Sequence, residues 1–319
     1  MKKIAILTSG GDAPGMNACI RACVRSALSK GMEVYGVDRG YKGLVKNKIF
    51  PMTSHSVCEI IHRGGTILKS ARCLEFKETE TRKIAAENLK ALGIEGLVVI
   101  GGDGSITGAK ALSDDYGINV VGIPGTIDND LAYTDFTLGF DTAVNTVLWA
   151  INALRDTMTS HDRVSIIKVM GRHCGDIALY AGICGGAEYI LVPEVPYDIQ
   201  KIANEIKKNK ERGKTASIIV LAEGAGNEQE IKTIVSVISG ADVKFSTLGH
   251  IQRGGTPTMA DRMLAAKFGF KAIELLESGK TNRVVGCRGK EIFDMDITEA
   301  LSMKKNFEKK IYDMAAVLS

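Results

Sequence analysis

The chain has 319 residues, of which 45% are hydrophobic and 24% are charged, and its formal net charge at pH 7 is +4. One hydrophobic core rarely grows beyond about 250–300 residues, so we expect two domains. The sequence has no dense Lys/Arg stripe with interleaved aromatic residues and no apolar run long enough to span a membrane. We therefore expect neither nucleic acid nor a membrane as a partner.

The cysteines and histidines form no disulfide or zinc pattern. Seven cysteines without regular spacing are typical of reduced thiols, and the five histidines are scattered. The apolar run Ile4–Leu7 is too short for a signal peptide. We therefore expect a cytoplasmic protein.

Short apolar runs alternate with amphipathic helical patterns along the chain, which is typical of α/β proteins. The predicted strands are mostly apolar at consecutive positions, as in a parallel sheet that is buried on both faces. They are Ile4–Thr8, Glu33–Val37, Gly96–Ile100, Asn119–Ile123, Val164–Met170, Ser217–Ala222, Val243–Leu248 and Arg283–Cys287. The predicted helices are Asn17–Ser29, Glu80–Leu92, Ser105–Ser113, Thr142–Thr157, Ile199–Glu211, Glu228–Ile238 and Met259–Leu276.

This alternation predicts βαβ units that form two doubly wound, Rossmann-like parallel-sheet lobes. Gly93 and Gly279 follow predicted helices and are expected to cap their C-terminal ends. A boundary near Gly139 divides the pattern into two comparable halves. No low-complexity linker separates them, so we expect the lobes to pack against each other.

A first glycine cluster, Thr8–Asn17, follows the first predicted strand and leads into a helix. Such a turn can bind phosphate through free backbone amides and the helix dipole. Met16 and Asn17 stand where a Walker A loop requires Lys-Ser/Thr, so the cluster is not that motif. A tight turn without a ligand is the alternative interpretation.

A second cluster, Gly101–Ser105, follows the strand Gly96–Ile100. Its glycines would let the backbone approach a triphosphate, and Asp103 could hold a magnesium ion that bridges the phosphate oxygens. Ser105 is expected to cap the following helix.

A third loop, Gly122–Asp130, carries Thr126, Asp128 and Asp130 beyond the carboxyl end of a buried strand. The two carboxylates would repel each other unless a metal or a basic group lay near them, or unless one of them had a role in proton transfer. An Asp/Asn-rich turn is the alternative. Three such loops together favour phosphoryl transfer, which needs an amide cradle, a metal, a base and positive charge.

Three arginines could supply that positive charge, because each follows a glycine-rich turn or a predicted strand. They are Arg72, Arg172 and Arg253. Each alone is more often part of a surface ion pair, but the repetition favours recognition of a second phosphorylated ligand. Glu223 could accept hydrogen bonds from sugar hydroxyls.

Six motifs in this order resemble those of the bacterial ATP-dependent 6-phosphofructokinases, over essentially the whole chain. The Gly-Gly-Asp-Gly motif is also found in NAD kinases and lipid kinases, but the six together are specific. They are Thr8–Asp12, Gly101–Ser105, Pro124–Asp130, Gly139–Ala143, Met170–His173 and Gly249–Gly255.

The resemblance implies two lobes with the active site in the cleft between them. The larger, ATP-binding lobe would comprise residues 1–138 and about 251–301. The smaller lobe, residues 139–250 and about 302–319, would bind fructose 6-phosphate.

The resemblance also implies a glycolytic kinase that transfers the γ-phosphoryl of Mg-ATP to the 1-hydroxyl of fructose 6-phosphate. Asp128 would be the general base, assisted by Thr126, Arg172 and Gly11, and Asp103 and Asp130 would organise Mg²⁺. ATP would contact Gly11, Tyr41, Arg72, Cys73, Gly102, Asp103, Gly104 and Ser105. Fructose 6-phosphate would contact Thr126, Asp128, Arg163, Met170, Gly171, Arg172, Glu223, Lys244, His250 and Arg253.

A homotetramer is implied as well, with Arg163 and Lys244 reaching the substrate of a neighbouring subunit. ADP or phosphoenolpyruvate would regulate the enzyme from a subunit interface. The implied effector residues are Arg21, Arg25, Ser54, Glu59, Arg155, Gly186, Glu188, Arg212 and Lys214.

The chain departs from the family pattern at three of these positions. The family has a basic residue at Ser54, often Asp at Glu59, and Arg at Lys244, so we expect weaker effector binding and weaker substrate binding. Pyrophosphate-using relatives usually carry Asp and Lys at Gly104 and Gly125, so the two glycines favour ATP. A pyrophosphate-dependent enzyme, an NAD-kinase-like enzyme and a non-catalytic nucleotide sensor are the alternatives.

Overall fold

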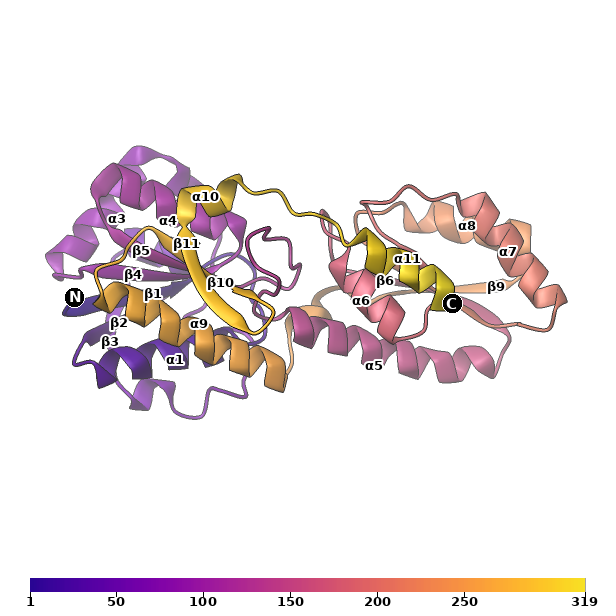
Figure 1. The fold of residues 1–319 in the computed structure, drawn as a ribbon, viewed down its shortest axis with the longest axis horizontal. Helices are drawn as coiled ribbons and strands as arrows, with labels where there is room; N and C mark the ends of the chain where they lie inside the picture. Colours follow the sequence, from indigo (N-terminus) through magenta and orange to yellow (C-terminus); the bar gives the residue numbers. More distant parts are fainter. Residues whose placement is uncertain (319) are drawn as a thin grey trace. The chain divides into compact units, whose positions relative to one another are not determined.

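The computed structural model describes residues 1–318 and divides the chain into two compact units (Figure 1). The first unit contains Met1–Ile127, Leu131–Thr142 and Arg253–Lys305. The second contains Asp128–Asp130, Ala143–Gln252 and the chain from Asn306 onwards. Residue 319, which was expected to end the smaller lobe, lies outside the described residues. Within residues 1–318, no helix has both the length and the apolar character needed to cross a membrane.

A seven-stranded sheet forms the centre of the first unit. Its order is β11 (Glu291–Asp296), β10 (Arg283–Arg288), β5 (Asn119–Pro124), β4 (Gly96–Gly101), β1 (Lys3–Thr8), β2 (Glu33–Val37) and β3 (Ile49–Met52). The five inner strands are parallel, whereas the edge strands β3 and β11 pair antiparallel with their neighbours. The inner strands are apolar at consecutive positions because helices cover both faces of the sheet.

Helices of the first unit pack on both sides of this sheet (Figure 1). One side carries α1 (Met16–Ser29) and α9 (Met259–Glu277), which lie against each other. The other side carries α3 (Thr79–Ala91), α4 (Asp103–Tyr116) and α10 (Ile297–Ser302). The short helix α2 (Gly40–Val45) joins the same hydrophobic core as α3 and α4, through Tyr41 and Leu44.

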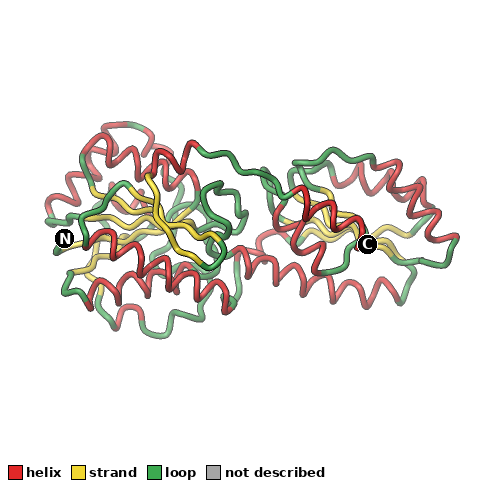
Figure 2. Tube along the Cα trace, in the orientation of Figure 1, coloured by secondary structure: helices red, strands yellow, loops and turns green. Residues whose placement is uncertain are grey.

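The second unit contains a four-stranded parallel sheet (Figure 2). Its order is β7 (Tyr189–Leu191), β8 (Ser217–Ala222), β6 (Arg163–Val169) and β9 (Asp242–Thr247). Its core joins the sheet to α7 (Ile199–Glu211) and α8 (Glu228–Ser239). The remaining helices are α5 (Phe140–Thr159), which begins in the first unit, α6 (Asp176–Cys184) and α11 (Lys309–Leu318).

The two sheets confirm the predicted α/β class with two parallel-sheet lobes. All eight predicted strands are present, but β3, β7 and β11 were not predicted. Two of these are edge strands of the first sheet: β3 contains Pro51, and half of the residues of β11 are acidic, so neither resembles a buried strand. Helix α6 was missed because it is apolar on all sides and lacks a helical period.

Candidate active site

The strand order places the first two glycine clusters side by side. From β1 the chain continues to β2 and β3 on one side, and later returns to β4, β5 and β10 on the other, so the order reverses between β1 and β4. The crevice at the carboxyl ends of such strands is the usual ligand site of α/β sheets. The N–H of Ser9 donates to the carbonyl of Ile100 at 3.0 Å, and the N–H of Gly125 donates to the carbonyl of Gly101 at 3.0 Å. The loops after β1, β4 and β5 are therefore adjacent.

A distant segment, residues 63–72, is fastened over the loop after β1. The Asn17 side chain is buried and donates to the carbonyls of Arg63 and Gly64 at 3.1 and 3.0 Å. It also accepts from the N–H of Ile67 at 2.7 Å. The hydroxyl of Thr8 donates to the carbonyl of Lys69 at 2.9 Å. Asn17 thus forms part of the support of the loop, a role that the sequence motif did not reveal.

An open cavity of about 590 Å³ lies between these two segments, entirely within the first unit. Its volume is within the range of about 300–1,000 Å³ that is typical of small-molecule sites. Two expected ATP-binding residues, Gly11 and Arg72, line it. The full lining is Gly10, Gly11, Asp12, Gly64, Gly65, Thr66, Lys69, Ser70, Ala71 and Arg72.

The loop after β4 leads directly into helix α4. Gly102 is the N-cap residue, Asp103 begins the helix with an exposed carboxylate, and the first backbone amides of the helix follow. Free amides and the helix dipole at this position favour a phosphate group. The expectation that Ser105 caps the helix is wrong: Ser105 is buried inside the first turn, because the helix starts two residues earlier than predicted.

Two aromatic side chains, Tyr41 and Phe76, pack near the expected nucleotide-binding residues at the start of α4. Tyr41 is buried, and its hydroxyl donates to the carbonyl of Ser105. Its ring stacks on Phe76 with 4.1 Å between centroids. Phe76 belongs to the 3₁₀ helix η2 (Leu74–Lys77), which follows Cys73. Burial is the main cause that raises the pKa of the Cys73 thiol. Tyr41 therefore contacts the first turn of α4, and its contact with ATP stays a prediction.

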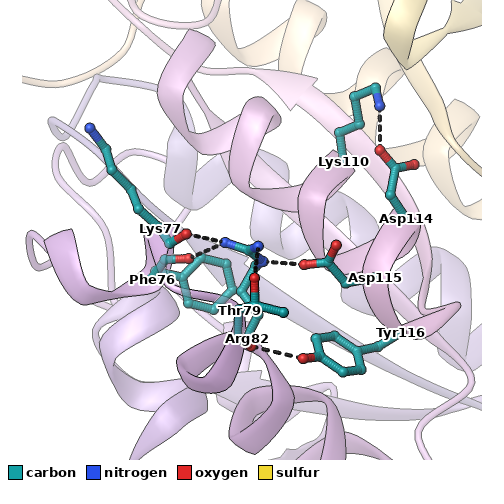
Figure 3. A network of polar contacts seen from close by, with 8 residues as sticks. All are labelled: Phe76, Lys77, Thr79, Arg82, Lys110, Asp114, Asp115 and Tyr116. Carbon is teal, nitrogen blue, oxygen red and sulfur yellow. Dashed lines mark hydrogen bonds and ion pairs between the residues drawn. The ribbon is translucent and has the colours of Figure 1, made fainter.

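The position of η2 is set by a buried arginine, Arg82 (Figure 3). Its guanidinium donates to the carbonyls of Phe76 and Lys77 at 3.0 and 2.6 Å and to the carboxylate of Asp115 at 2.6 Å. A fourth hydrogen bond, of 3.1 Å, reaches the hydroxyl of Thr79. Arg82 thus ties η2 to α3 and α4, and it was not singled out from the sequence.

Arg253, which is far from the first glycine loop in the sequence, contacts this loop in the structure. A Cβ on Gly11 would lie 2.1 Å from Nη1 of Arg253, so only glycine leaves room for the guanidinium. Nη1 donates to the carbonyl of Asp12 at 3.4 Å. The structure therefore brings together two expected site residues that are 242 positions apart in the sequence.

The loop after β5 places two carboxylates on either side of a buried asparagine. Asn129 is 2% exposed and has a left-handed backbone with φ of 52°. Its side-chain amide donates to Asp176 at 2.9 Å. Asp128 is half-buried, whereas Asp130 is exposed. Thr126 precedes them, and its carbonyl accepts a hydrogen bond of 2.6 Å from the hydroxyl of Thr137. Asn129 therefore holds this turn, which neither composition nor spacing indicated.

In the second unit, the loops after β6 and β8 bring Arg172 and Glu223 together. Nη2 of Arg172 donates to Oε1 of Glu223 at 2.8 Å. Glu223 is the main cause that raises the pKa of Arg172, and the charge of Asp128 adds a smaller contribution of the same sign. Asp128 and Arg172 are therefore within electrostatic reach of each other. Met170 and Gly171 lie in the same loop, which Gln252, 0% exposed, fixes by accepting from the N–H of Met170 at 3.1 Å.

Two further expected substrate residues share one carboxylate. Nε of Arg163 lies 2.8 Å from Asp242, and Nζ of Lys244 lies 2.9 Å from the other oxygen of the same residue. Hydrogen bonds from Lys244 and Arg163 lower the pKa of Asp242. Asp242 thereby holds both cations at one end of the neighbouring strands β6 and β9. His250, also expected to contact the substrate, is exposed in the 3₁₀ helix η3 (Gly249–Arg253).

The expected effector residues are divided between the two units. In the first unit, Arg21 and Arg25 lie one turn apart on α1. Ser54 and Glu59 are exposed on either side of the 3₁₀ helix η1 (His55–Val57).

In the second unit, Arg155 donates to the carbonyls of Gly185 and Gly186. Nζ of Lys214 lies 3.1 Å from Glu188, which also accepts from the N–H of Ile218 at 2.7 Å. Arg212 is exposed at the C-terminal end of α7. The structure brings Lys214 and Glu188 into direct contact, and effector binding stays a prediction.

Glycine loops and a helix N-terminus at the carboxyl ends of parallel strands define an α/β protein built to bind phosphate groups. Comparison with known protein families gives a match to the phosphofructokinase family over residues 3–276. The chain therefore belongs to the phosphofructokinase family.

Curated relatives match the entire chain, and two of them illustrate the similarity. A Clostridium botulinum (strain Loch Maree / Type A3) protein named ATP-dependent 6-phosphofructokinase is 57% identical over 319 residues, covering 100% of both chains. A Clostridium perfringens (strain 13 / Type A) protein named ATP-dependent 6-phosphofructokinase 1 is 58% identical with the same coverage. Among solved structures, Saccharomyces cerevisiae phosphofructokinase has a TM-score of 0.87 and 34% identity. That match covers 100% of this chain and 47% of the yeast chain. These matches confirm the family expected from the motifs.

Proposed function

We propose that the chain transfers the γ-phosphoryl group of ATP to the 1-hydroxyl of fructose 6-phosphate, giving fructose 1,6-bisphosphate and ADP. The names of two full-length relatives support this activity. The structural observation that carries it is the adjacency of the loops after β1, β4 and β5 at the reversal point of the first sheet. Phosphoryl transfer depends mainly on positioning and on electrostatic stabilisation, which such loops provide.

ATP would bind in the first unit, with its phosphates on the backbone of Gly11 and of the Gly102–Ser105 loop. Arg72, in the cavity beside Gly11, would add positive charge. Cys73, the N-cap residue of η2, is a further expected contact of ATP, and Tyr41 packs against Phe76 of the same short helix. Gly104 supports an ATP site, because nothing lies within 4 Å of a Cβ built there and the space beside the helix N-terminus stays open.

The proposed reaction would use Mg²⁺. Within residues 1–318, no group of three or more His, Cys, Asp or Glu side chains is arranged to hold a metal ion. This suits Mg²⁺, which proteins commonly bind through one or two carboxylates together with substrate phosphates. Asp103, exposed at the start of α4, and Asp130 would be those carboxylates. When bound, the ion would neutralise charge on the phosphate oxygens.

Asp128 would accept the proton of the sugar hydroxyl. It is half-buried in the turn that Asn129 holds, which limits its mobility. The guanidinium of Arg172, within electrostatic reach of this carboxylate, would offset charge on the transferring phosphoryl. Thr126 would assist from the same loop, and Gly11 would keep Arg253 and the phosphate-binding backbone in place.

Fructose 6-phosphate would be held mainly by the second unit. Glu223, paired with Arg172, would accept hydrogen bonds from sugar hydroxyls. Met170, Gly171 and His250 would shape the sugar site, and Arg253 is a further expected substrate residue. Arg163 and Lys244, gathered by Asp242, would bind the 6-phosphate of a substrate in a neighbouring subunit.

The proposal extends to assembly, regulation and location. A homotetramer is proposed because Arg163 and Lys244 would act across a subunit interface. ADP or phosphoenolpyruvate would bind between subunits at the effector residues described above. A cytoplasmic location agrees with a glycolytic role, and all seven cysteines, which lie within the described residues, are free thiols.

A coupled assay with fructose 6-phosphate as the acceptor tests the proposed function. ATP and pyrophosphate are supplied as donors in parallel reactions. We expect turnover with ATP and Mg²⁺ and negligible turnover with pyrophosphate. Appreciable turnover with pyrophosphate would show that ATP is not the specific donor. Phosphorylation of NAD in place of the sugar would contradict the proposed reaction.

A further inference from the structure

The loop between β2 and β3 carries a concentration of positive charge that the proposed reaction does not use. Residues 39–48 read Arg-Gly-Tyr-Lys-Gly-Leu-Val-Lys-Asn-Lys, which includes four cationic side chains and no carboxylate. The loop folds back on itself: the N–H of Asp38 donates to the carbonyl of Lys48 at 3.0 Å, and the N–H of Lys48 donates to that of Gly43 at 2.8 Å. Both ends of the loop and helix α2 are thereby brought close together.

The four cationic residues line a single cavity of about 270 Å³. This volume lies just below the range of about 300–1,000 Å³ that is typical of drug-sized ligands, so the cavity suits a compact group. Lys46 and Lys48 are exposed, and Lys42 is half-buried. The basic pocket consists of Arg39, Lys42, Gly43, Lys46 and Lys48.

Most of this charge is not neutralised within the described chain. The carboxylate of Asp38 lies 3.6 Å from Nε of Arg39, but it is shared with Lys69, whose Nζ lies 3.9 Å away. Within residues 1–318, the three lysines of the basic pocket take part in no ion pair with a carboxylate. Like charges around a small cavity repel one another, and an anion with several charges would relieve that repulsion.

We propose that the basic pocket binds a compact, multiply charged phosphate anion, namely a diphosphate or triphosphate group. Such a group carries enough charge to balance three lysines and an arginine, whereas one carboxylate does not. The guanidinium of Arg39 can form two parallel hydrogen bonds to one phosphate, and the lysines act as point charges around the others. The proposal is independent of the kinase activity, because the basic pocket shares no residue with the proposed ATP and fructose 6-phosphate sites.

Site-resolved lysine acetylation of the wild-type protein tests the binding directly. The chain is treated with an acetylating ester in the presence and absence of inorganic tripolyphosphate, and each lysine is followed by mass spectrometry. Lys46 and Lys48 are the reporters. Lys207 and Lys208, two exposed lysines on α7, are the internal controls. We expect tripolyphosphate to slow acetylation of the reporters several-fold and to leave the controls unchanged. No protection, equal protection of both pairs, or the same effect from sulfate at equal ionic strength overturns the proposal.

A matched pair of variants gives a second test. Lys46→Gln/Lys48→Gln and Lys207→Gln/Lys208→Gln each remove two positive charges from exposed positions. By calorimetry at physiological ionic strength, we expect the first variant to lose one tripolyphosphate site per chain that the second variant retains. In the first variant the affinity of that site should be at least about tenfold lower, because hydrogen bonds between charged groups are stronger than those between neutral groups. Equal stoichiometry and affinity in the two variants would overturn the proposal.

The same footprint distinguishes the two sources of the phosphate group. Lys46 and Lys48 are the better reporters for this purpose. The charge of Lys42 also acts on Cys73, where it opposes the rise in the pKa of the thiol, and Cys73 belongs to the proposed ATP site. Protection by ADP at a lower concentration than tripolyphosphate identifies a nucleotide tail, and protection by tripolyphosphate alone identifies an inorganic polyphosphate. Both results support the binding of a phosphate anion by the basic pocket.

Discussion

The guanidinium of Arg253 occupies the place that a side chain at residue 11 would take, with only 2.1 Å between Nη1 and a Cβ built on Gly11. Gly11 does not have a left-handed backbone, so alanine would fit its conformation and would act only by displacing Arg253. We expect Gly11→Ala to lower kcat/KM for fructose 6-phosphate by roughly 10- to 100-fold, the range for losing contacts to a charged group. Steady-state kinetics measure this loss.

A double-mutant cycle with Arg253→Ala then tests whether Gly11 acts through that arginine. If it does, the two substitutions are far from additive. Additive losses would mean that the methyl group disturbs the phosphate-binding backbone itself.

Asp128→Ala should lower kcat by roughly 10²- to 10⁴-fold, the range expected when a general base is removed. Binding of both substrates should change much less, since the carboxylate acts mainly in the transition state. Asp130→Ala is the companion variant, whose defect should be relieved in part by a higher magnesium concentration. An unchanged kcat with a raised KM would make Asp128 a binding residue.

Gly104→Asp should sharply weaken the use of ATP, because a carboxylate at the start of α4 would lie close to the nucleotide phosphates. The fold should tolerate the change, since a Cβ at Gly104 meets no atom within 4 Å. Gly104→Ala is the matched control, which adds the Cβ without the charge and should retain most of the activity. Equal losses in the two variants would point to crowding in place of repulsion.

Lys244→Arg should lower half-saturation for fructose 6-phosphate several-fold and leave kcat nearly unchanged. An arginine can make two parallel hydrogen bonds to a phosphate, and the gain should be on the order of 1.5 kcal/mol or less. The 6-phosphate does not react, so the effect belongs in KM.

Lys244→Ala should raise half-saturation. Asp242→Asn should also change it, because the carboxylate of Asp242 contacts both Lys244 and Arg163. If Lys244→Ala leaves half-saturation unaltered, this lysine does not reach the substrate.

Asp261 predicts a pH dependence of stability. It is 1% exposed and accepts hydrogen bonds of 2.8 Å from the N–H groups of Gly139 and Thr142, at the start of α5. Burial nevertheless raises its pKa from 3.8 to about 6. The folded state thus holds the proton more tightly than the unfolded chain does. The contribution of Asp261 to stability should therefore fall as pH rises from about 4 to about 6, by on the order of 2–3 kcal/mol.

Urea unfolding of the wild type and of Asp261→Asn across this pH range isolates the contribution of Asp261. The stability of the wild type relative to the variant should decrease with increasing pH. An increase would mean that the donated hydrogen bonds outweigh the cost of burying the charge.

The parallel core of the fold could be predicted from the sequence because β1, β4, β5, β6 and β8 are apolar at consecutive positions. The edge strand β11 could not be predicted, because Glu291, Asp294 and Asp296 interrupt its apolar residues and its pairing with β10 is a tertiary contact. The motifs pointed to expected site residues on the loops, whereas the residues that support those loops were missed. Asn129, Gln252 and Arg82 are buried polar residues whose function depends on partners far along the chain.

Asp242 is a similar case. An exposed Asp between apolar residues carries no local signal, and only the pairing of β6 with β9 places Arg163 beside it. Residues that contact a ligand thus leave a motif in the sequence, but residues that position them become visible only through the tertiary structure.

The first unit cannot be completed until almost the whole chain has been synthesised. Its sheet receives β10 and β11, and helix α1 receives its partner α9, only from Arg253–Lys305. The ribosome releases Ala143–Gln252, the central part of the second unit, before Arg253–Lys305, so the nascent chain must keep the apolar faces of α1 and β5 without their final cover during that time. Truncation anywhere before Arg253 should therefore leave an aggregation-prone first unit, and assistance by a chaperone is most needed over this interval of synthesis.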